Sequence, residues 1–249
     1  MPLPYPYNPA ESYTRIGHIM PSSNTWAEPL TYAMNMQEAG RISHHFSRIT
    51  VQKLALNAAS EAHFQFEPML AAARLLADAP LDVITWNGTA ASWRGIEQDH
   101  KLCEAIEAET GIKATSATIG YYDLFARKNW KKISLAVPYT EDVTAAIVET
   151  YTRSGFEVVH AVSLGCVANV DIGATPPDKM RALLRAAAHD AADCIAVVCT
   201  NFPATALAEE IEAETGIAMA DSISVTYLDA CLKAGVTPKI TGWGKMFDM

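Results

Sequence analysis

A seven-residue run occurs twice in this chain and constrains how the chain can fold. Ile106 to Ile112 reads Ile-Glu-Ala-Glu-Thr-Gly-Ile, and Ile211 to Ile217 repeats it residue for residue. Each copy follows an apolar run, a polar turn and a helical pattern, and each precedes a run of small residues. The alternative is that both copies are only good helix C-termini with a capping glycine. We favour an internal duplication, which predicts two similar halves that face each other across a cleft.

Composition narrows the class of protein. The 249 residues suffice for one large or two small domains, and no apolar run approaches the ~18 residues of a membrane span. The opening residues do not have the pattern of a signal peptide. A net charge of −9 argues against nucleic acid and anionic membranes as partners. Five cysteines with no CxxC pair and no Cys/His cluster indicate reduced thiols, so we expect a cytoplasmic protein without a metal site.

Strand and helix patterns alternate along the chain. This alternation predicts parallel sheets, and several strands are apolar throughout, as expected when helices cover both faces. We therefore expect an α/β fold of two similar Rossmann-like lobes, each with a parallel four-stranded sheet, related by a pseudo-twofold axis. The expected strands span about 15–20, 44–51, 81–86, 113–116, 132–137, 156–163, 194–199 and 217–220. The expected helices include 61–79, 96–110, 177–192 and 204–215.

The boundary between the lobes is expected near the crossover at 125–129. The first lobe would comprise residues 12–124 together with the C-terminal stretch 236–249, which returns to pack on it. The second lobe would comprise residues 125–235. No linker or low-complexity tract separates them, which favours one two-lobed unit. Oligomeric state is open, and a homo-oligomer is compatible with the sequence.

Ligands of such sheets bind beyond the carboxyl ends of the strands, and the unusual residues of this chain collect there. Small, polar or thiol side chains follow the expected strands at Pro21, Ser22 and Asn24, at Gly88, Thr89 and Ala90, at Tyr139, at Asn169, and at Cys199, Thr200 and Asn201. We take Cys199 as the candidate catalytic residue and the others as candidate substrate-binding residues.

Cys199 is the leading candidate because it ends an apolar strand and begins a turn into a helix. A thiol at a helix N-terminus feels the positive end of the dipole, which favours thiolate and can bring the pKa close to neutral. Cys103, Cys194 and Cys231 lie in apolar patterns typical of a core. Cys166 lies in a polar turn and stays open as a second functional thiol.

The duplication makes a sharper statement about the first half. Counted back from each repeat, Cys199 corresponds to about Gly88, so one side of the cleft has a thiol and the other has Gly-Thr. A symmetric two-base racemase needs a thiol on each side, whereas this chain offers one proton donor. The turn at 87–94 can bind a carboxylate or an enediolate oxygen through Thr89 and the amides, or can be an ordinary helix N-cap. The same alternative applies to Asn24.

The strand-end residues together resemble the aspartate/glutamate racemase superfamily, in the branch of maleate cis–trans isomerases and arylmalonate decarboxylases. Residues 15–25, Arg-Ile-Gly-His-Ile-Met-Pro-Ser-Ser-Asn-Thr, are similar to the isomerase opening. Residues 88–95, Gly-Thr-Ala-Ala-Ser-Trp-Arg-Gly, and the tail at 242–247 resemble the decarboxylases. The resemblance covers nearly the whole chain and implies a cofactor-independent site between the lobes.

The resemblance also implies roles for single residues. Isomerases and racemases of the group use a cysteine from each lobe, and the decarboxylases share with this chain a glycine at the first position. Thr89, Tyr139 and the amides of Ala90 and Thr200 would hold the enediolate oxygens. Ala90 departs from the decarboxylases, which have a hydroxyl there. By the same resemblance, Ser22, Asn24 and Asn169 would bind a carboxylate, which suggests a small polar dicarboxylate.

Function follows as a hypothesis with open alternatives. We expect an enzyme that acts at the carbon next to a carboxylate and decarboxylates a malonate-like diacid through an enediolate that Cys199 protonates. The alternatives are a maleate-type isomerase, an Asp/Glu-type racemase, and a non-catalytic dicarboxylate-binding protein. The sequence has no GxGxxG, GxxxxGK[ST], HExxH or GxSxG motif. His18 is expected in the core, and His44 and His45 point to opposite sides of a strand, a poor metal pair.

Overall fold

Two parallel four-stranded sheets, one from each half of the chain, form the frame of the protein. The computed structural model describes residues 13–38, 40–51 and 66–248. The first sheet has the strand order β2-β1-β3-β4 and the second has the order β6-β5-β7-β8. The two orders are equivalent, and the predicted α/β fold with two parallel four-stranded sheets is confirmed.

The strands of the first sheet are β1 (Thr14–Pro21), β2 (Ile42–Ile49), β3 (Val83–Trp86) and β4 (Lys113–Ser116). Those of the second are β5 (Lys132–Val137), β6 (Glu157–Ser163), β7 (Cys194–Val197) and β8 (Ala218–Asp221). All described residues of β3 and β7 are buried, because helices cover both faces of each sheet. This burial explains why these strands are apolar throughout instead of alternating.

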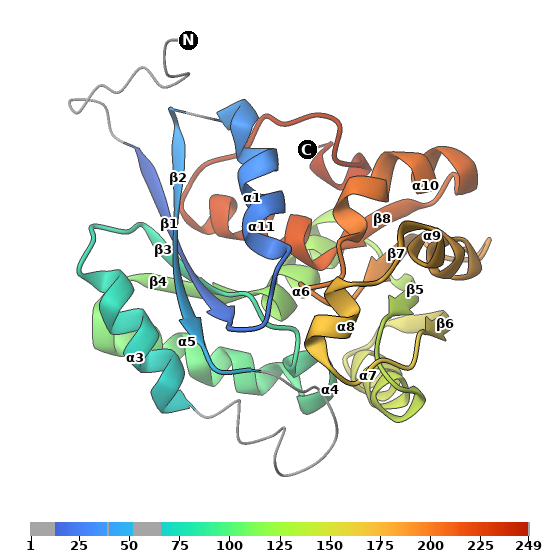
Figure 1. Cartoon of the computed structure of the whole chain (residues 1–249), viewed down its shortest axis with the longest axis horizontal. Helices are drawn as coiled ribbons and strands as arrows, with labels where there is room; N and C mark the ends of the chain where they lie inside the picture. The colour runs from blue at the N-terminus through green and yellow to red at the C-terminus, as the bar shows by residue number, and fades with distance from the viewer. Residues whose placement is uncertain (1–12, 39, 52–65, 249) are drawn as a thin grey trace.

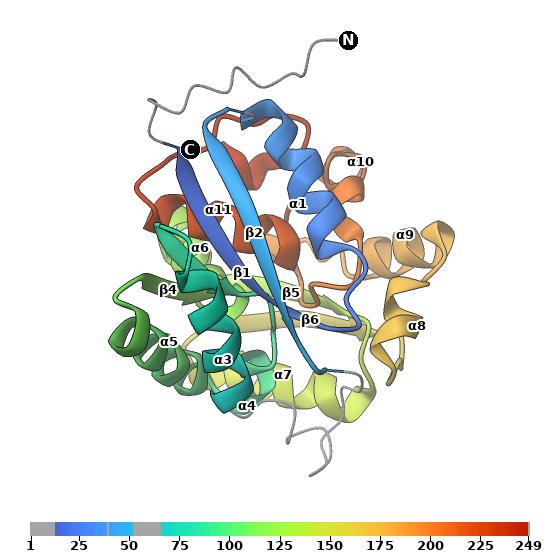
Figure 2. The same cartoon turned by 60° about the vertical axis from the view of Figure 1, so that its left-hand side comes forward.

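Helices and short 3-10 turns connect the strands. In the first half they are α1 (Ala27–Asn35), η1 (Met36–Glu38), α3 (Phe66–Ala77), α4 (Ala91–Arg94), α5 (Ile96–Thr110) and α6 (Ala117–Lys128). In the second half they are α7 (Glu141–Arg153), α8 (Asn169–Gly173), α9 (Pro177–Ala186), η3 (Ala204–Leu207), α10 (Ala208–Thr215), α11 (Ser222–Lys233) and η4 (Lys245–Phe247). Figures 1 and 2 show α3 and α5 on one face of the first sheet and α1 and α11 on the other.

The two helices that follow the last strand of each sheet cross to the opposite half. The Tyr121 hydroxyl of α6 donates to the carbonyl of Val197 in β7 at 2.6 Å. In return, Asp229 of α11 accepts a hydrogen bond from the Thr115 hydroxyl of β4 at 2.5 Å. Because each helix covers the sheet of the other half, the sheets are held in one unit and the carboxyl ends of their strands meet.

Several predicted boundaries change in the structure. The strand expected to run to residue 199 ends at Val197, and the helix expected over 177–192 ends at Ala186. The helix expected from residue 204 begins as the 3-10 turn η3 and becomes α-helical only at Ala208. The N-terminal part of the helix expected over 61–79, residues 61–65, lies outside the described residues.

The C-terminal stretch contacts both halves. Thr241 exchanges hydrogen bonds with Gln37 of η1, whereas the Lys245 amide donates to Glu212 of α10 at 2.8 Å. The expected division at residues 124 and 125 falls inside α6, which itself packs on the second sheet. The assignment of these segments to lobes therefore stays a prediction.

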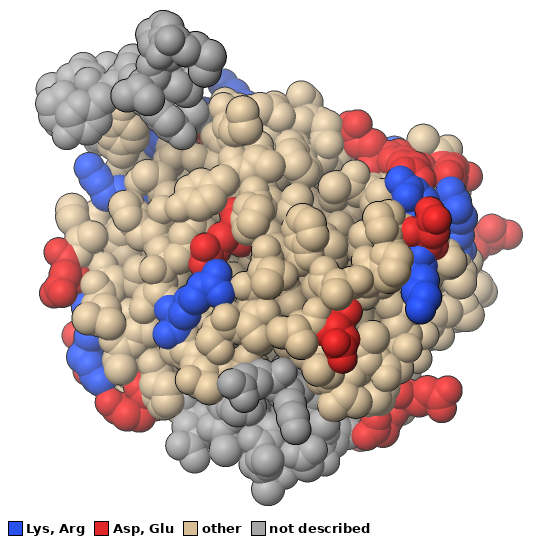
Figure 3. Space-filling model, viewed as in Figure 1, with Lys and Arg blue, Asp and Glu red and all other residues tan. Residues whose placement is uncertain are grey.

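Exposed charges on the face seen in Figure 3 gather in part along the rim formed by α9 and α10, where acidic and basic side chains alternate. Arg181 pairs with Glu210 and Arg185 with Glu214, at 2.7 Å and 2.6 Å. Exposed pairs of this kind each contribute about 0–1 kcal/mol, so this rim adds little to stability. Among the described residues, no helix has the length and apolarity needed to cross a membrane.

Candidate active site

A small cavity lies where the carboxyl ends of the two sheets meet. Its volume is about 20 Å³, close to what one water molecule needs. The first half contributes Pro21, Val51, Trp86, Gly88, Thr89, Ala90 and Trp93, and the second half contributes Tyr139, Asn169, Cys199 and Thr200. Thus Cys199 and seven of the ten residues proposed from sequence to bind substrate line one cavity.

Cys199 lies two residues beyond the end of β7 and is 2 % exposed. Its amide donates to the Ser222 hydroxyl at 2.9 Å, and its sulfur accepts the Asn201 amide at 3.4 Å. Burial raises the pKa of the thiol to about 11, although hydrogen bonds from Tyr139 and from backbone amides oppose the shift. The expectation of a thiolate near neutral pH is therefore wrong. The reason is that desolvation outweighs the hydrogen bonds to the sulfur, and that helix α10, which was expected to begin at residue 204, begins only at Ala208, farther along the chain from the thiol.

Tyr139 connects the thiol to the first half of the molecule. The ring is 1 % exposed, its hydroxyl lies 3.1 Å from the Thr89 hydroxyl, and it also hydrogen-bonds the Cys199 sulfur. Trp93 packs against it edge-on with ring centroids 5.3 Å apart. Because burial raises the pKa of Tyr139 well above its usual value, the hydroxyl keeps its proton and serves as a donor.

Backbone amides add further donors to the cavity wall. No described residue accepts a hydrogen bond from the amides of Thr89, Ala90 or Thr200. The first two precede helix α4 (Ala91–Arg94), and the third follows Cys199 directly. Amides of this kind, together with the Thr89 and Tyr139 hydroxyls, are the groups that stabilise an oxyanion.

Three of the proposed binding residues do not line the cavity. The side-chain oxygen of Asn24 accepts the amides of Trp26 and Ala27 just before helix α1, and its side-chain amide donates to the Thr200 carbonyl at 2.9 Å. Asn201 accepts the Thr25 amide at 2.8 Å. Both side chains thus hold the strand-end loops of the two halves together. The N-cap residue of α1 is Trp26, so Asn24 supports the helix start without being its cap residue.

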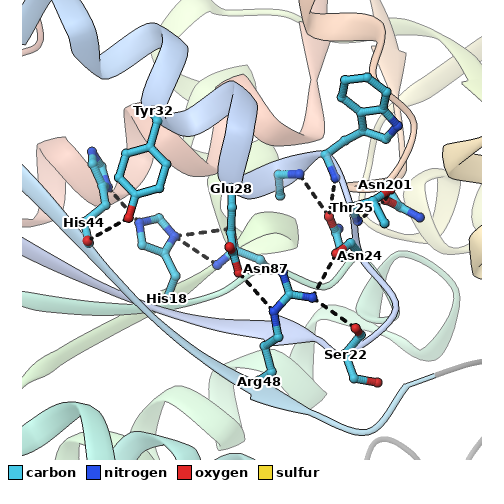
Figure 4. Close-up of polar contacts among 12 residues, drawn as sticks. His18, Ser22, Asn24, Thr25, Glu28, Tyr32, His44, Arg48, Asn87 and Asn201 are labelled. Atoms are coloured by element: carbon cyan, nitrogen blue, oxygen red, sulfur yellow. Dashed lines mark hydrogen bonds and ion pairs between the residues drawn. The ribbon is translucent and has the colours of Figure 1, made fainter.

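Ser22 is the third. It is exposed, and its hydroxyl accepts the Val51 amide at 3.2 Å. Arg48 holds the same loop by donating to the carbonyls of Ser22 and Asn24 while it pairs with Glu28 (Figure 4). By contrast, Asn169 does line the cavity, and its side-chain amide donates to the Ser23 hydroxyl at 2.9 Å.

The strand register identifies the counterpart of Cys199 in the first half. Ile16 of β1 pairs with Val83, and Ile133 of β5 pairs with Cys194. Counted from these equivalent positions, Gly88 is the counterpart of Cys199. The other thiols do not compensate, since Cys103, Cys194 and Cys231 are buried in the core and Cys166 is not part of the cavity wall.

Sequence reasoning missed three residues of the wall, namely Val51, Trp86 and Trp93. A usable signal existed for Trp86, because side chains two apart on a strand share a face and Gly88 was already a candidate. No comparable signal was available for Val51.

His18 and His44 lie apart from this wall, and burial keeps both neutral. His18 is fully buried and joins His44 through its Nε2 at 2.8 Å and Asn87 through its Nδ1 (Figure 4). Burial lowers the pKa of His18 to about 3 and that of His44 to about 2. Within the described ranges, no group of three or more His, Cys, Asp or Glu residues could hold a metal ion.

Known proteins resemble this chain in sequence and in fold. The chain is 25 % identical to the maleate isomerase of Geobacillus stearothermophilus over 85 % of this chain and 88 % of that protein. A variant of the Nocardia farcinica maleate cis-trans isomerase with a covalently bound succinylcysteine intermediate superposes with a TM-score of 0.87 at 18 % identity, covering 95 % and 98 % of the two chains. Unliganded arylmalonate decarboxylase superposes with a TM-score of 0.75 at 20 % identity, covering 94 % and 99 %.

The family model for arylmalonate decarboxylase matches residues 38–247. This match spans both halves of the chain and includes Gly88, Tyr139 and Cys199. The chain therefore belongs to the arylmalonate decarboxylase family and is an enzyme of the lyase or isomerase kind that this family and its relatives represent.

Proposed function

We propose that the protein decarboxylates a small malonate-like dicarboxylate and that Cys199 protonates the resulting carbanion. The observation that carries the proposal is a single buried thiol, kept protonated by its surroundings, that shares a cavity with Gly88 at the equivalent position of the other half. A protonated thiol is suited to general acid catalysis. It is poorly suited to nucleophilic attack, which requires the thiolate.

The proposed reaction consists of cleavage of a carbon–carbon bond followed by transfer of a proton. The bond between the α-carbon and one carboxylate breaks, and carbon dioxide leaves. The electron pair stays on the α-carbon and delocalises into the remaining carboxylate as an enediolate. The S–H bond of Cys199 then breaks and its proton forms the new C–H bond, after which solvent returns a proton to the sulfur.

The donors around the cavity supply the stabilisation that this path needs. Negative charge builds up on the oxygens of the remaining carboxylate, where Thr89, Tyr139 and the amides of Ala90 and Thr200 would contact it. A single oxyanion donor is typically worth about 3–4 kcal/mol of transition-state stabilisation. The thiolate left after proton transfer accepts hydrogen bonds from Tyr139 and the Asn201 amide.

The test is Cys199→Ser assayed with methylmalonate in deuterium oxide. We expect the wild type to release carbon dioxide and to incorporate one deuterium at the α-carbon. The variant should lose turnover by about three orders of magnitude or more and still bind the diacid in calorimetry. Cys166→Ser, which removes a thiol outside the cavity wall, is the control and should keep full activity. Unchanged turnover in Cys199→Ser would end the proposal.

Isomerisation of a maleate-type diacid is the second candidate, favoured by the similarity to named maleate isomerases. The same assay, repeated with maleate beside methylmalonate, separates the reactions. Conversion between cis and trans diacids would indicate an isomerase, and deuterium exchange without release of carbon dioxide would indicate a racemase. Tight binding with neither outcome would indicate a non-catalytic dicarboxylate-binding protein.

A further inference from the structure

The Trp86 side chain lies over Gly88. A β-carbon built on Gly88 would lie 2.2 Å from both Cε2 and Cζ2 of the indole and 2.6 Å from its Nε1. Trp86 is 1 % exposed, and Gly88 has no positive φ angle that would require glycine for conformational reasons. The absence of a side chain at position 88 is therefore imposed by the indole and not by the backbone.

The second half shows what this position holds without the indole. By the strand register, the counterpart of Trp86 is Val197, and the counterpart of Gly88 is Cys199. A small residue in β7 thus precedes a thiol, whereas a large residue in β3 precedes a glycine. The volume that a side chain at 88 would fill is taken by Trp86.

Trp86 also separates two cavities. It lines the active-site cavity together with Ala90, and the same two residues line a second cavity of about 10 Å³. That second cavity is also lined by the apolar side chains of Phe66, Met69 and Leu102 and by the polar side chains of Arg94, Gln98 and Asp99. The indole therefore stands between the two cavities, and a smaller residue at position 86 would add the volume that the indole now fills to both.

We propose that Trp86 is the specificity-determining residue of this enzyme, which restricts the α-carbon of the substrate to hydrogen or a small aliphatic substituent and keeps a second acid/base out of the first half. This inference rests on the proposed function in taking the ligand to be an α-substituted diacid. A smaller residue at position 86 joins the two cavities and admits an aromatic substituent.

The thermal stability of the wild type, Gly88→Ala, Trp86→Val and the double variant tests the contact between the indole and position 88. Gly88→Ala adds only the β-carbon and should lower Tm by about 5 °C or more in the wild-type background, because the core is overpacked. In a Trp86→Val background, the same substitution should change Tm by less than about 2 °C. Equal effects of Gly88→Ala in the two backgrounds would show that the indole does not occupy this space and would overturn the inference.

The rate at which Cys199 is alkylated measures the size of the cavity and does not depend on enzymatic turnover. Cys199 is alkylated with bromoacetate and with 2-bromo-2-phenylacetate, and the rates are read from intact mass and peptide mapping. Trp86→Val and the milder Trp86→Phe should each raise the ratio of the bulky to the small reagent, by at least about tenfold for valine. Trp130→Val, which removes an indole outside both cavities, should leave the ratio unchanged. A ratio unaffected by either substitution at 86 overturns the inference.

The diacids then separate this inference from the proposed function. If Trp86→Val favours phenylmalonate over methylmalonate in calorimetry by a similar factor, both the partition and the ligand class are supported. If the alkylation ratio changes but no diacid is decarboxylated, the partition stands and the proposed function fails. If diacids are decarboxylated and their selectivity is unmoved by Trp86→Val, the proposed function stands and the specificity role fails.

Discussion

The two halves share a scaffold that is equivalent in detail, yet they differ at the ends of their strands. In each half, a glutamate of the repeated run accepts the amide seven residues later at 2.8 Å, Glu107 from Ala114 and Glu212 from Met219. Each copy also ends in a glycine with a left-handed backbone, at φ 72° and 75°. The repeated sequence is therefore a local structural unit. In both copies the glutamate side chain accepts the equivalent backbone amide, and the glycine ends the helix in the same conformation.

A second pair of contacts shows how far the halves have diverged while keeping the scaffold. In the first half, Ser116 caps α6 and donates to Asp99 of the preceding helix at 2.5 Å. In the second half, Asp221 caps α11 and accepts a hydrogen bond from Thr205. The capping residue therefore carries the hydroxyl in the first half and the carboxyl in the second, and its partner carries the other group. Burial raises the pKa of Asp99 and that of Asp221 to about 7, so either arrangement holds a carboxyl group that ionises less readily than usual.

The strand ends differ in kind and not only in arrangement. Trp86 and Gly88 correspond to Val197 and Cys199, so one half presents a thiol and the other presents a wall with hydroxyl and amide donors. Two equivalent sheets thus present different groups to one cavity, because one strand end carries the thiol of Cys199 and the other carries the bulk of Trp86 beside a glycine.

Tyr139→Phe is expected to have the largest effect on this asymmetry, because the hydroxyl links the thiol of one half to Thr89 of the other. The ring keeps its packing on Trp93, and only the donor is lost. We expect kcat for decarboxylation to fall by about 10²- to 10³-fold with little change in KM. Tyr122→Phe, which removes a hydroxyl that bonds Ser154 away from the site, is the control. An unchanged kcat in Tyr139→Phe would show that the two halves act independently.

The repeated glutamates give a smaller effect that is unequal between the halves. Glu212 is 4 % exposed and accepts the amides of both Met219 and Lys245, whereas Glu107 is exposed and accepts one amide from Ala114. Loss of a buried acceptor leaves its donors without partners, so Glu212→Ala should cost about 3 kcal/mol of unfolding free energy and Glu107→Ala about 1 kcal/mol. Thermal unfolding should show Tm losses of roughly 6–12 °C and 2–4 °C. Equal losses would mean that the C-terminal stretch does not depend on Glu212.

Local sequence patterns encode the scaffold of the two halves but not the way the halves pack on each other. The duplication was visible because its signals are local: a repeated run, a capping glycine and apolar strands. The counterpart of Cys199 followed from counting. By contrast, the exchange of α6 and α11 between sheets depends on contacts such as that of Tyr121 with Val197, which no local pattern encodes.

The candidate site was predictable in part for the same reason. The positions of Thr89, Tyr139 and Cys199 at strand ends predict that they lie at one cavity. These positions do not predict whether a polar side chain there faces a ligand or a neighbouring loop. The side chains of Asn24 and Asn201 form hydrogen bonds with the loops around them, and the sequence does not specify this side-chain orientation. The protonation of Cys199 was mispredicted because burial, a tertiary property, outweighs the amides near the sulfur.

The smallest expected effect should be equal in the two halves and tests whether the repeated run is one structural unit used twice. A β-carbon on Gly111 or on Gly216 would meet nothing within 4 Å, so only the left-handed backbone opposes a side chain there. That conformation costs a non-glycine residue about 1 kcal/mol, and Gly111→Ala and Gly216→Ala should each lower Tm by roughly 2–4 °C. Because the two sites lie in different halves and share no contact, the double variant should lose the sum of the two free energies in urea titration. A markedly larger loss at Gly216 would mean that the second copy depends on its surroundings, and the equivalence of the two runs would then be one of sequence and shape but not of energy.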